Sequence, residues 1–194
     1  VSGGGGRGMR TVADPAELNR RVETEKKRFQ GEEIYGKTLG VVGLGAIGAL
    51  VAEAGLRLGM QVLGYDPAIS VDAAWRLPSD VQRMENLPTL FARSDYVTLH
   101  VPLLDQTRNM INEESLKSFR PSTVLLNFAR QEIVDEAALS KAVGTGRLAR
   151  YFSDFPSPTL LKLPNVFATP HLGASTAEAE ENCAVMAADQ LIDF

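Results

Sequence analysis

The chain has 194 residues, of which 44% are hydrophobic and 23% are charged, a balance typical of one globular domain with a sizeable core. Its 20 basic and 24 acidic side chains leave a net charge of -4, which argues against nucleic acid or an anionic membrane surface as a partner. The single cysteine, Cys183, excludes an internal disulfide, and no apolar run resembles a signal peptide or a membrane span, so we expect a cytoplasmic protein.

The first 32 residues predict a leader and an arm outside the core. Residues 1–10, VSGGGGRGMR, are too rich in glycine to pack, and we expect a flexible segment there. In residues 15–29, PAELNRRVETEKKRF, the apolar positions Leu18, Val22 and Phe29 recur at roughly helical spacing among charged residues. This pattern predicts an exposed helix, with residues 33–194 forming the folded domain.

After Gly36, short apolar runs alternate with helical patterns. Strands are predicted at residues 39–42, 61–65, 96–101, 123–127, 150–153 and 166–169, and helices at residues 46–58, 87–93, 113–119 and 136–143. Short apolar strands separated by helices indicate a parallel sheet covered on both faces. The sequence therefore predicts an α/β doubly wound parallel sheet, a Rossmann fold of six or seven strands. Ligands of such folds bind beyond the carboxyl ends of the strands.

A glycine-rich turn, GLGAIG, follows the first predicted strand. Gly43, Gly45 and Gly48 form G-x-G-x-x-G at the opening of a helix, which permits a tight turn, close approach of a pyrophosphate and close helix packing. Asp66 ends the next strand, where a carboxylate can bind an adenosine ribose and repel the 2'-phosphate of NADP. Together these residues predict NAD as the cofactor. Methyltransferases, which bind a nucleoside cofactor with a related loop, are the competing enzyme class.

Three later segments accompany GLGAIG in order: YVTLHVPLLDQTRNMIN, STVLLNFARQEIVDEAALSKAV and ATPHLGASTAEAEEN. With them, the chain from about Gly36 to Phe194 resembles the NAD-binding domain of the D-isomer-specific 2-hydroxyacid dehydrogenases, most closely the members that act on 3-phosphoglycerate in serine biosynthesis. The resemblance implies hydride transfer between nicotinamide and a 2-hydroxy acid or its 2-keto acid, and a homodimer. It also implies that residues 33–194 end in a helix leading back to a substrate domain absent from this chain.

The resemblance assigns catalytic roles to Arg130, Asp154 and His171. Arg130 would hold the substrate carboxylate and polarise the C2 oxygen, and His171 would exchange the hydroxyl proton. Asp154 matches an acid that faces the nicotinamide end, and all three also count among the cofactor contacts. The remaining contacts implied by the resemblance are Ala46, Ile47, Val101, Pro102, Phe128, Ala129, Gly173 and Ala174. His100 is expected to shape the cofactor wall, and no metal site is predicted.

Two departures from the family pattern bear on this chemistry. Gln131 follows Arg130 where the family usually has a glycine, which alters the loop and leaves the arginine. The glutamate that usually orients and charges the histidine is missing, because the residue with the matching spacing, in FPSPT, is Thr159. A threonine cannot carry the charge that this task needs.

Asp154 is therefore the acid expected to influence His171, because adjacent strand ends converge on one cleft and an anion there would favour the imidazolium. Glu178 and Glu180, on a helix predicted to start near Ser175, are weaker candidates. Loss of the usual glutamate also leaves open another class of function, an NAD-responsive binding module of the corepressor kind that performs no turnover.

Overall fold

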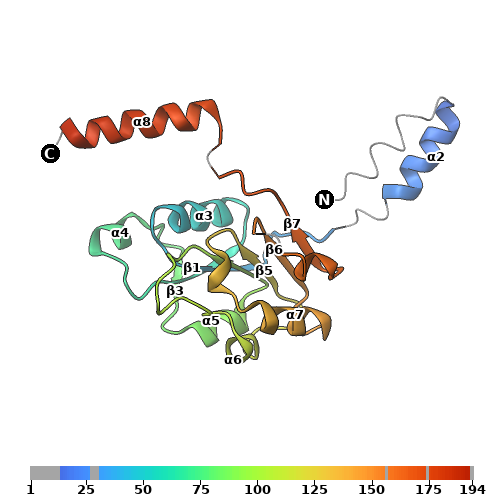
Figure 1. Ribbon diagram of the computed structural model, residues 1–194, viewed down its shortest axis with the longest axis horizontal. Helices are drawn as coiled ribbons and strands as arrows, with labels where there is room; N and C mark the ends of the chain where they lie inside the picture. The colour runs from blue at the N-terminus through green and yellow to red at the C-terminus, as the bar shows by residue number, and fades with distance from the viewer. Residues whose placement is uncertain (1–13, 27–30, 156, 174, 193–194) are drawn as a thin grey trace.

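A computed structural model describes residues 14–26, 31–155, 157–173 and 175–192, and its centre is one parallel sheet (Figure 1). The seven strands lie in the order β3-β2-β1-β4-β5-β6-β7, so the chain winds outward from the middle in both directions. This confirms the predicted doubly wound α/β fold. The strands are β1 Thr38–Val42, β2 Gln61–Tyr65, β3 Gln82–Arg83, β4 Tyr96–Leu99, β5 Val124–Asn127, β6 Arg150–Ser153 and β7 Val166–Ala168.

The register brings the carboxyl ends of the strands level with one another. Val42 of β1 lies beside Tyr65 of β2 and Leu99 of β4. Leu99 lies beside Asn127 of β5, and the same row continues through Ser153 of β6 to Ala168 of β7. Each residue that follows one of these positions therefore leaves the sheet at the same edge.

Helices cover both faces of the sheet. In Figure 1, α3 (Ala46–Arg57) and α4 (Val71–Arg76) lie on one side, and α5 (Leu87–Arg93), α6 (Glu113–Leu116) and α7 (Glu136–Gly144) lie on the other. Leu39 and Val41 of β1 pack in the cluster that contains Ala52 of α3, whereas Val42 packs in the cluster that contains Leu90 of α5. This alternation along a strand gives the domain two cores.

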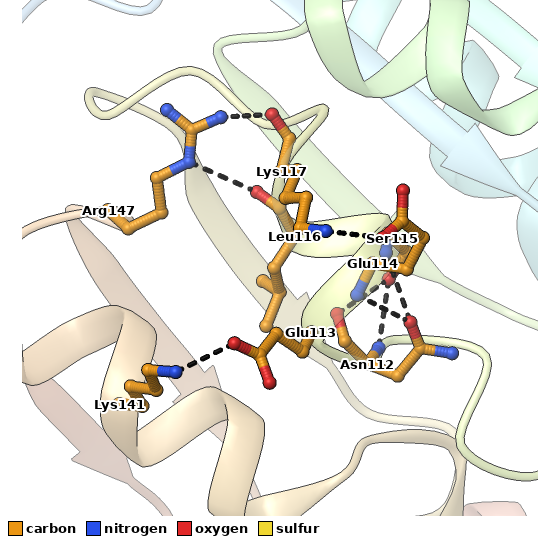
Figure 2. A network of polar contacts seen from close by, with 8 residues as sticks. All are labelled: Asn112, Glu113, Glu114, Ser115, Leu116, Lys117, Lys141 and Arg147. Carbon is orange, nitrogen blue, oxygen red and sulfur yellow. Dashed lines mark hydrogen bonds and ion pairs between the residues drawn. The ribbon is translucent and has the colours of Figure 1, made fainter.

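The single-turn helix α6 is held by side chains at both of its ends (Figure 2). Asn112 caps its start by accepting hydrogen bonds from the backbone N–H groups of Glu114 and Ser115, each at 3.0 Å. Arg147 donates to the carbonyl oxygens of Leu116 and Lys117 at its end. These bonds satisfy backbone groups that a four-residue helix cannot satisfy internally.

Two elements of the sheet layers were missed from sequence. β3 has only two residues, both exposed and polar, and α4 has only six residues and buries none of them, so neither is long enough to show a repeating apolar pattern. The strand predicted to reach Val101 ends at Leu99, although the backbone N–H of His100 still donates to the carbonyl of Val42 at 2.7 Å.

Two helices flank the layered body. α2 (Pro15–Lys26) and α8 (Ala177–Ile192) lie apart from the sheet in Figure 1. α2 buries no residue, in keeping with an exposed arm, and the predicted leader and the end of the arm lie outside the described residues. No helix in the described part of the chain is long and apolar enough to cross a membrane.

Candidate functional site

A cleft of about 480 Å³ opens at the carboxyl edge of the sheet, beside the start of α3 and the loops that follow β4 and β5. It collects residues from three separate predicted motifs. The lining residues are Gly45, Ala46, Ile47, His100, Val101, Pro102, Leu103, Ala129 and Arg130. Phe128, beside Ala129, is 45% exposed. The structure therefore gathers the glycine turn and the arginine loop around one cavity of the size that cofactors occupy.

The three glycines of the turn have different structural roles. Gly43 has a φ of 89°, and a Cβ placed on it would lie 2.6 Å from the carbonyl oxygen of His100. A Cβ on Gly48 would overlap the carbonyl oxygen of Gly43. A Cβ on Gly45, in contrast, would meet no atom within 4 Å, so this position faces open space. The chain itself requires glycine at the first and third positions, while the second leaves room for a ligand to approach the backbone.

Asp66 is fixed against the glycine turn by hydrogen bonds from the backbone. Its Oδ2 accepts from the N–H of Leu44 at 2.8 Å, and its Oδ1 accepts from the N–H of Ala68 at 2.9 Å. A carboxylate has about four acceptor positions, so both oxygens can still accept from ribose hydroxyls. The open position at Gly45 and this oriented acid fit the pyrophosphate and the adenosine ribose of a dinucleotide.

Arg130 presents its guanidinium at the cleft without a carboxylate partner among the described residues. The side chain is exposed, and its Nη1 donates to the carbonyl of Ala129 at 2.6 Å. A guanidinium can bind a planar carboxylate through two parallel hydrogen bonds. The side chain is therefore available to an anionic ligand.

His171 and Asp154 meet beyond the ends of β7 and β6. The His171 Nε2 and the Asp154 Oδ2 are 4.0 Å apart, with 53% of the histidine side chain and 13% of the aspartate side chain exposed. The other oxygen, Oδ1, is buried and has no hydrogen-bond partner in the described part of the chain. Phe155 packs against the imidazole, with ring centroids 4.8 Å apart in an edge arrangement. The pair is thus one carboxylate and one half-exposed ring, both at the carboxyl edge of the sheet.

The two weaker candidate acids, and the threonine at the position of the usual glutamate, do not pair with His171 in the residues that the structure describes. Glu178 and Glu180 lie exposed on α8, and Thr159 is exposed before a 3₁₀ turn. Gly173 has a φ of 54°, which marks a tight bend after His171, and the predicted contact Ala174 lies outside the described residues.

His100 is the second histidine of the chain and lines the cleft. Its Nε2 lies 2.9 Å from the hydroxyl of Thr98, and burial lowers the pKa of its imidazole below the usual value. A neutral ring held by a threonine is compatible with the wall position predicted from the sequence.

Asn127 is a buried residue at this edge that sequence reasoning missed. Its side-chain amide accepts from the backbone N–H of Ala129 and donates to the backbone carbonyl of Arg130 and to the hydroxyl of Tyr151. The signal available in the sequence was a polar residue ending the apolar run VLLN, because such residues are buried only when their hydrogen bonds are made.

Residues 8–173 match the family described as D-isomer specific 2-hydroxyacid dehydrogenase, NAD binding domain. The chain belongs to this family. The resemblance expected from the four motifs and the choice of NAD as cofactor are thereby confirmed. Among the described residues, no group of three or more His, Cys, Asp and Glu side chains could hold a metal ion.

Individual relatives within the family are similar over most of the chain. A D-3-phosphoglycerate dehydrogenase of Synechocystis is 40% identical over 95% of this chain and 34% of its own length. A hydroxypyruvate reductase of Thermotoga maritima is 41% identical over 83% of this chain and 54% of its own length. The chain thus spans between a third and about half of these curated relatives.

Solved structures give the same result for the fold. Apo D-mandelate dehydrogenase of Rhodotorula graminis matches 90% of this chain and 52% of its own length with a TM-score of 0.73 and 30% identity. An NAD-complexed D-isomer specific 2-hydroxyacid dehydrogenase of Lactobacillus delbrueckii matches 91% of this chain and 60% of its own length with a TM-score of 0.72 and 32% identity.

Proposed function

We propose that this chain is the cofactor domain of an NAD-dependent oxidoreductase that transfers hydride between nicotinamide and a D-2-hydroxy acid, with 3-phosphoglycerate as substrate. The proposal is supported by one observation: the strands end in register. The glycine turn, Arg130 and the Asp154–His171 pair, which follow these strand ends, therefore all lie at the carboxyl edge of the sheet. The choice of 3-phosphoglycerate is supported by relatives from Synechocystis and Methanocaldococcus jannaschii named as D-3-phosphoglycerate dehydrogenases.

The cofactor would be held at the glycine turn and the cleft. The backbone at Gly45, Ala46 and Ile47, at the start of α3, would bind the pyrophosphate, and Asp66 would accept from the adenosine ribose. When bound, the nicotinamide ring supplies the hydride acceptor or donor. The further contacts predicted at this wall are Val101, Pro102, Phe128, Ala129, Gly173 and Ala174.

The chain's own residues would manage the charge and the proton of the substrate. Arg130 would bind the carboxylate and stabilise negative charge on the C2 oxygen. His171 would take the hydroxyl proton on its imidazole and return it in the reverse direction. Asp154, whose Oδ2 lies 4.0 Å from the His171 Nε2, would stabilise the imidazolium in place of the usual glutamate.

The remaining parts of the enzyme would lie outside this chain. We propose that residues 33–194 form the cofactor domain and that a second domain, connected through α8, covers the cleft and supplies groups for the substrate phosphate. A second domain would also exclude water from the transferred hydride. We further propose that the enzyme is a cytoplasmic homodimer, which light scattering of the full-length protein would test.

Turnover by the full-length protein tests the proposal directly. With NAD and a panel of 3-phosphoglycerate, glycerate and lactate, we expect NADH formation fastest with 3-phosphoglycerate. His171→Ala should remove most of this turnover, while the protein still binds NAD. Tight NAD binding with no turnover of any hydroxy acid would instead identify an NAD-responsive binding module.

A further inference from the structure

Asn127 is a fully buried residue at the start of the loop whose residues Ala129 and Arg130 line the cleft. It is the last residue of β5, and its side chain is 0% exposed. The Nδ2 group donates to the carbonyl of Arg130 at 2.9 Å, and the Oδ1 accepts from the N–H of Ala129 at 3.2 Å. One buried side-chain amide therefore holds the loop of residues 128–130 through two hydrogen bonds, one to a backbone N–H and one to a backbone carbonyl of the loop.

The same amide is joined to the neighbouring strand. Its Nδ2 also donates to the phenolic oxygen of Tyr151 on β6 at 3.3 Å. Burial, together with the charges of Asp154 and Glu136, raises the pKa of Tyr151 above its usual range, so the phenol stays neutral. Tyr151 is 3% exposed, which keeps this hydrogen bond away from water.

The orientation of the Arg130 side chain depends on this loop conformation, because the side chain makes few interactions of its own. Among the described residues, its one side-chain hydrogen bond runs to the carbonyl of the adjacent Ala129, at 2.6 Å. The direction of the guanidinium is therefore set by the backbone of the loop. The strand ladder between β5 and β6 ends at Asn127 and Ser153 and does not include this loop.

We propose that Asn127, held by Tyr151, is a positioning residue that sets the backbone of the arginine loop and thereby aims Arg130 at the substrate carboxylate. The inference rests on the proposed function, since it assigns the substrate carboxylate to Arg130. It links the substrate-binding loop after β5 to β6, the strand that carries Asp154 at its end.

The test compares Tyr151→Phe and Asn127→Ala with a matched control in the full-length protein. Tyr151→Phe removes one hydroxyl and keeps the ring, so it remains informative if Asn127→Ala fails to fold. The control is Tyr96→Phe, the same change at the start of β4 on the opposite edge of the sheet. The measurements are the KM for 3-phosphoglycerate, kcat, the Kd of NAD, the Tm, and hydrogen exchange of the Ala129 amide.

We expect Tyr151→Phe to raise the KM about two- to tenfold, the range for one buried neutral hydrogen bond, with the Kd of NAD unchanged. Asn127→Ala should raise it further, and both variants should speed exchange at the Ala129 amide. Tyr96→Phe should match the parent in KM and exchange. An unchanged KM with unchanged exchange in Tyr151→Phe would overturn the inference, as would a KM rise accompanied by an equal rise in the Kd of NAD. If the parent turns over no hydroxy acid, the proposed function fails, and the exchange rates alone decide whether Asn127 orders the loop.

Discussion

Asp154→Asn in the full-length protein removes the charge beside His171 and preserves the size of the side chain. The charged atoms are 4.0 Å apart. At that separation the attraction is about 1 kcal/mol in bulk water and about 4 kcal/mol at an effective dielectric constant of about 20. Because 53% of the histidine side chain is exposed, solvent screening favours the lower part of this range, about 1–2 kcal/mol.

This attraction is available only when the imidazole carries a proton, so its loss should raise the barrier for proton transfer from the substrate. We expect kcat to fall about five- to thirtyfold, the rate equivalent of about 1–2 kcal/mol. The assay is steady-state oxidation of 3-phosphoglycerate at saturating NAD, with Glu178→Gln and Glu180→Gln as matched controls. An unchanged kcat in Asp154→Asn, or an equal loss in either control, would refute the pairing of Asp154 with His171.

Three further outcomes follow from the geometry. Asp66→Ala should weaken NAD about tenfold or more and remove the expected advantage of NAD over NADP, measured by calorimetric titration, because it deletes the charged acceptor proposed for the ribose. Gly45→Ala should weaken NAD without changing the Tm, since its Cβ meets no protein atom, whereas Gly48→Ala should lower the Tm as well, and equal Tm values would contradict this. Lys141 lowers the pKa of Glu113 through a 2.7 Å ion pair, so this contribution to stability is present above the usual pKa of 4.5 and is lost as the pH falls through the lowered value. Glu113→Gln should therefore reduce the fall in Tm between pH 7 and pH 3, and an identical fall would contradict the assignment.

The sheet could be predicted because its signals are local. Each of the predicted strands is a short, mainly apolar run bounded by turn residues. In the larger helices, apolar residues recur at helical spacing. β3 escaped prediction because Gln82 and Arg83 form an exposed edge whose pairing with β2 depends on the fold and not on any pattern of their own.

The positions of the candidate site residues could be predicted, whereas their contacts could not. A residue that follows a strand must leave at the carboxyl edge, which placed Asp66, Arg130 and Asp154 in advance. The distance of 4.0 Å between Asp154 and His171 depends on the register of β6 and β7 and on two loops. Likewise, the side-chain contact of Asn127 with Tyr151 exists only because β5 and β6 are neighbouring strands, so it could not be predicted from the two residue types.

The strand order has a consequence for how the chain folds during synthesis. Of the seven strands in this sheet, β1 is synthesised before the others. It can pair with β2 early, but its other edge stays unpaired until β4, which begins at Tyr96, has been made. Until then the backbone of Leu39 to Val42, a strand with apolar side chains, exposes unpaired N–H and C=O groups along one edge, which are a template for another strand. Pairing at such sequence separation carries a high contact order and proceeds slowly. A nascent chain halted before residue 96 should therefore be prone to aggregation, and it should become protected only once β4 has left the ribosome.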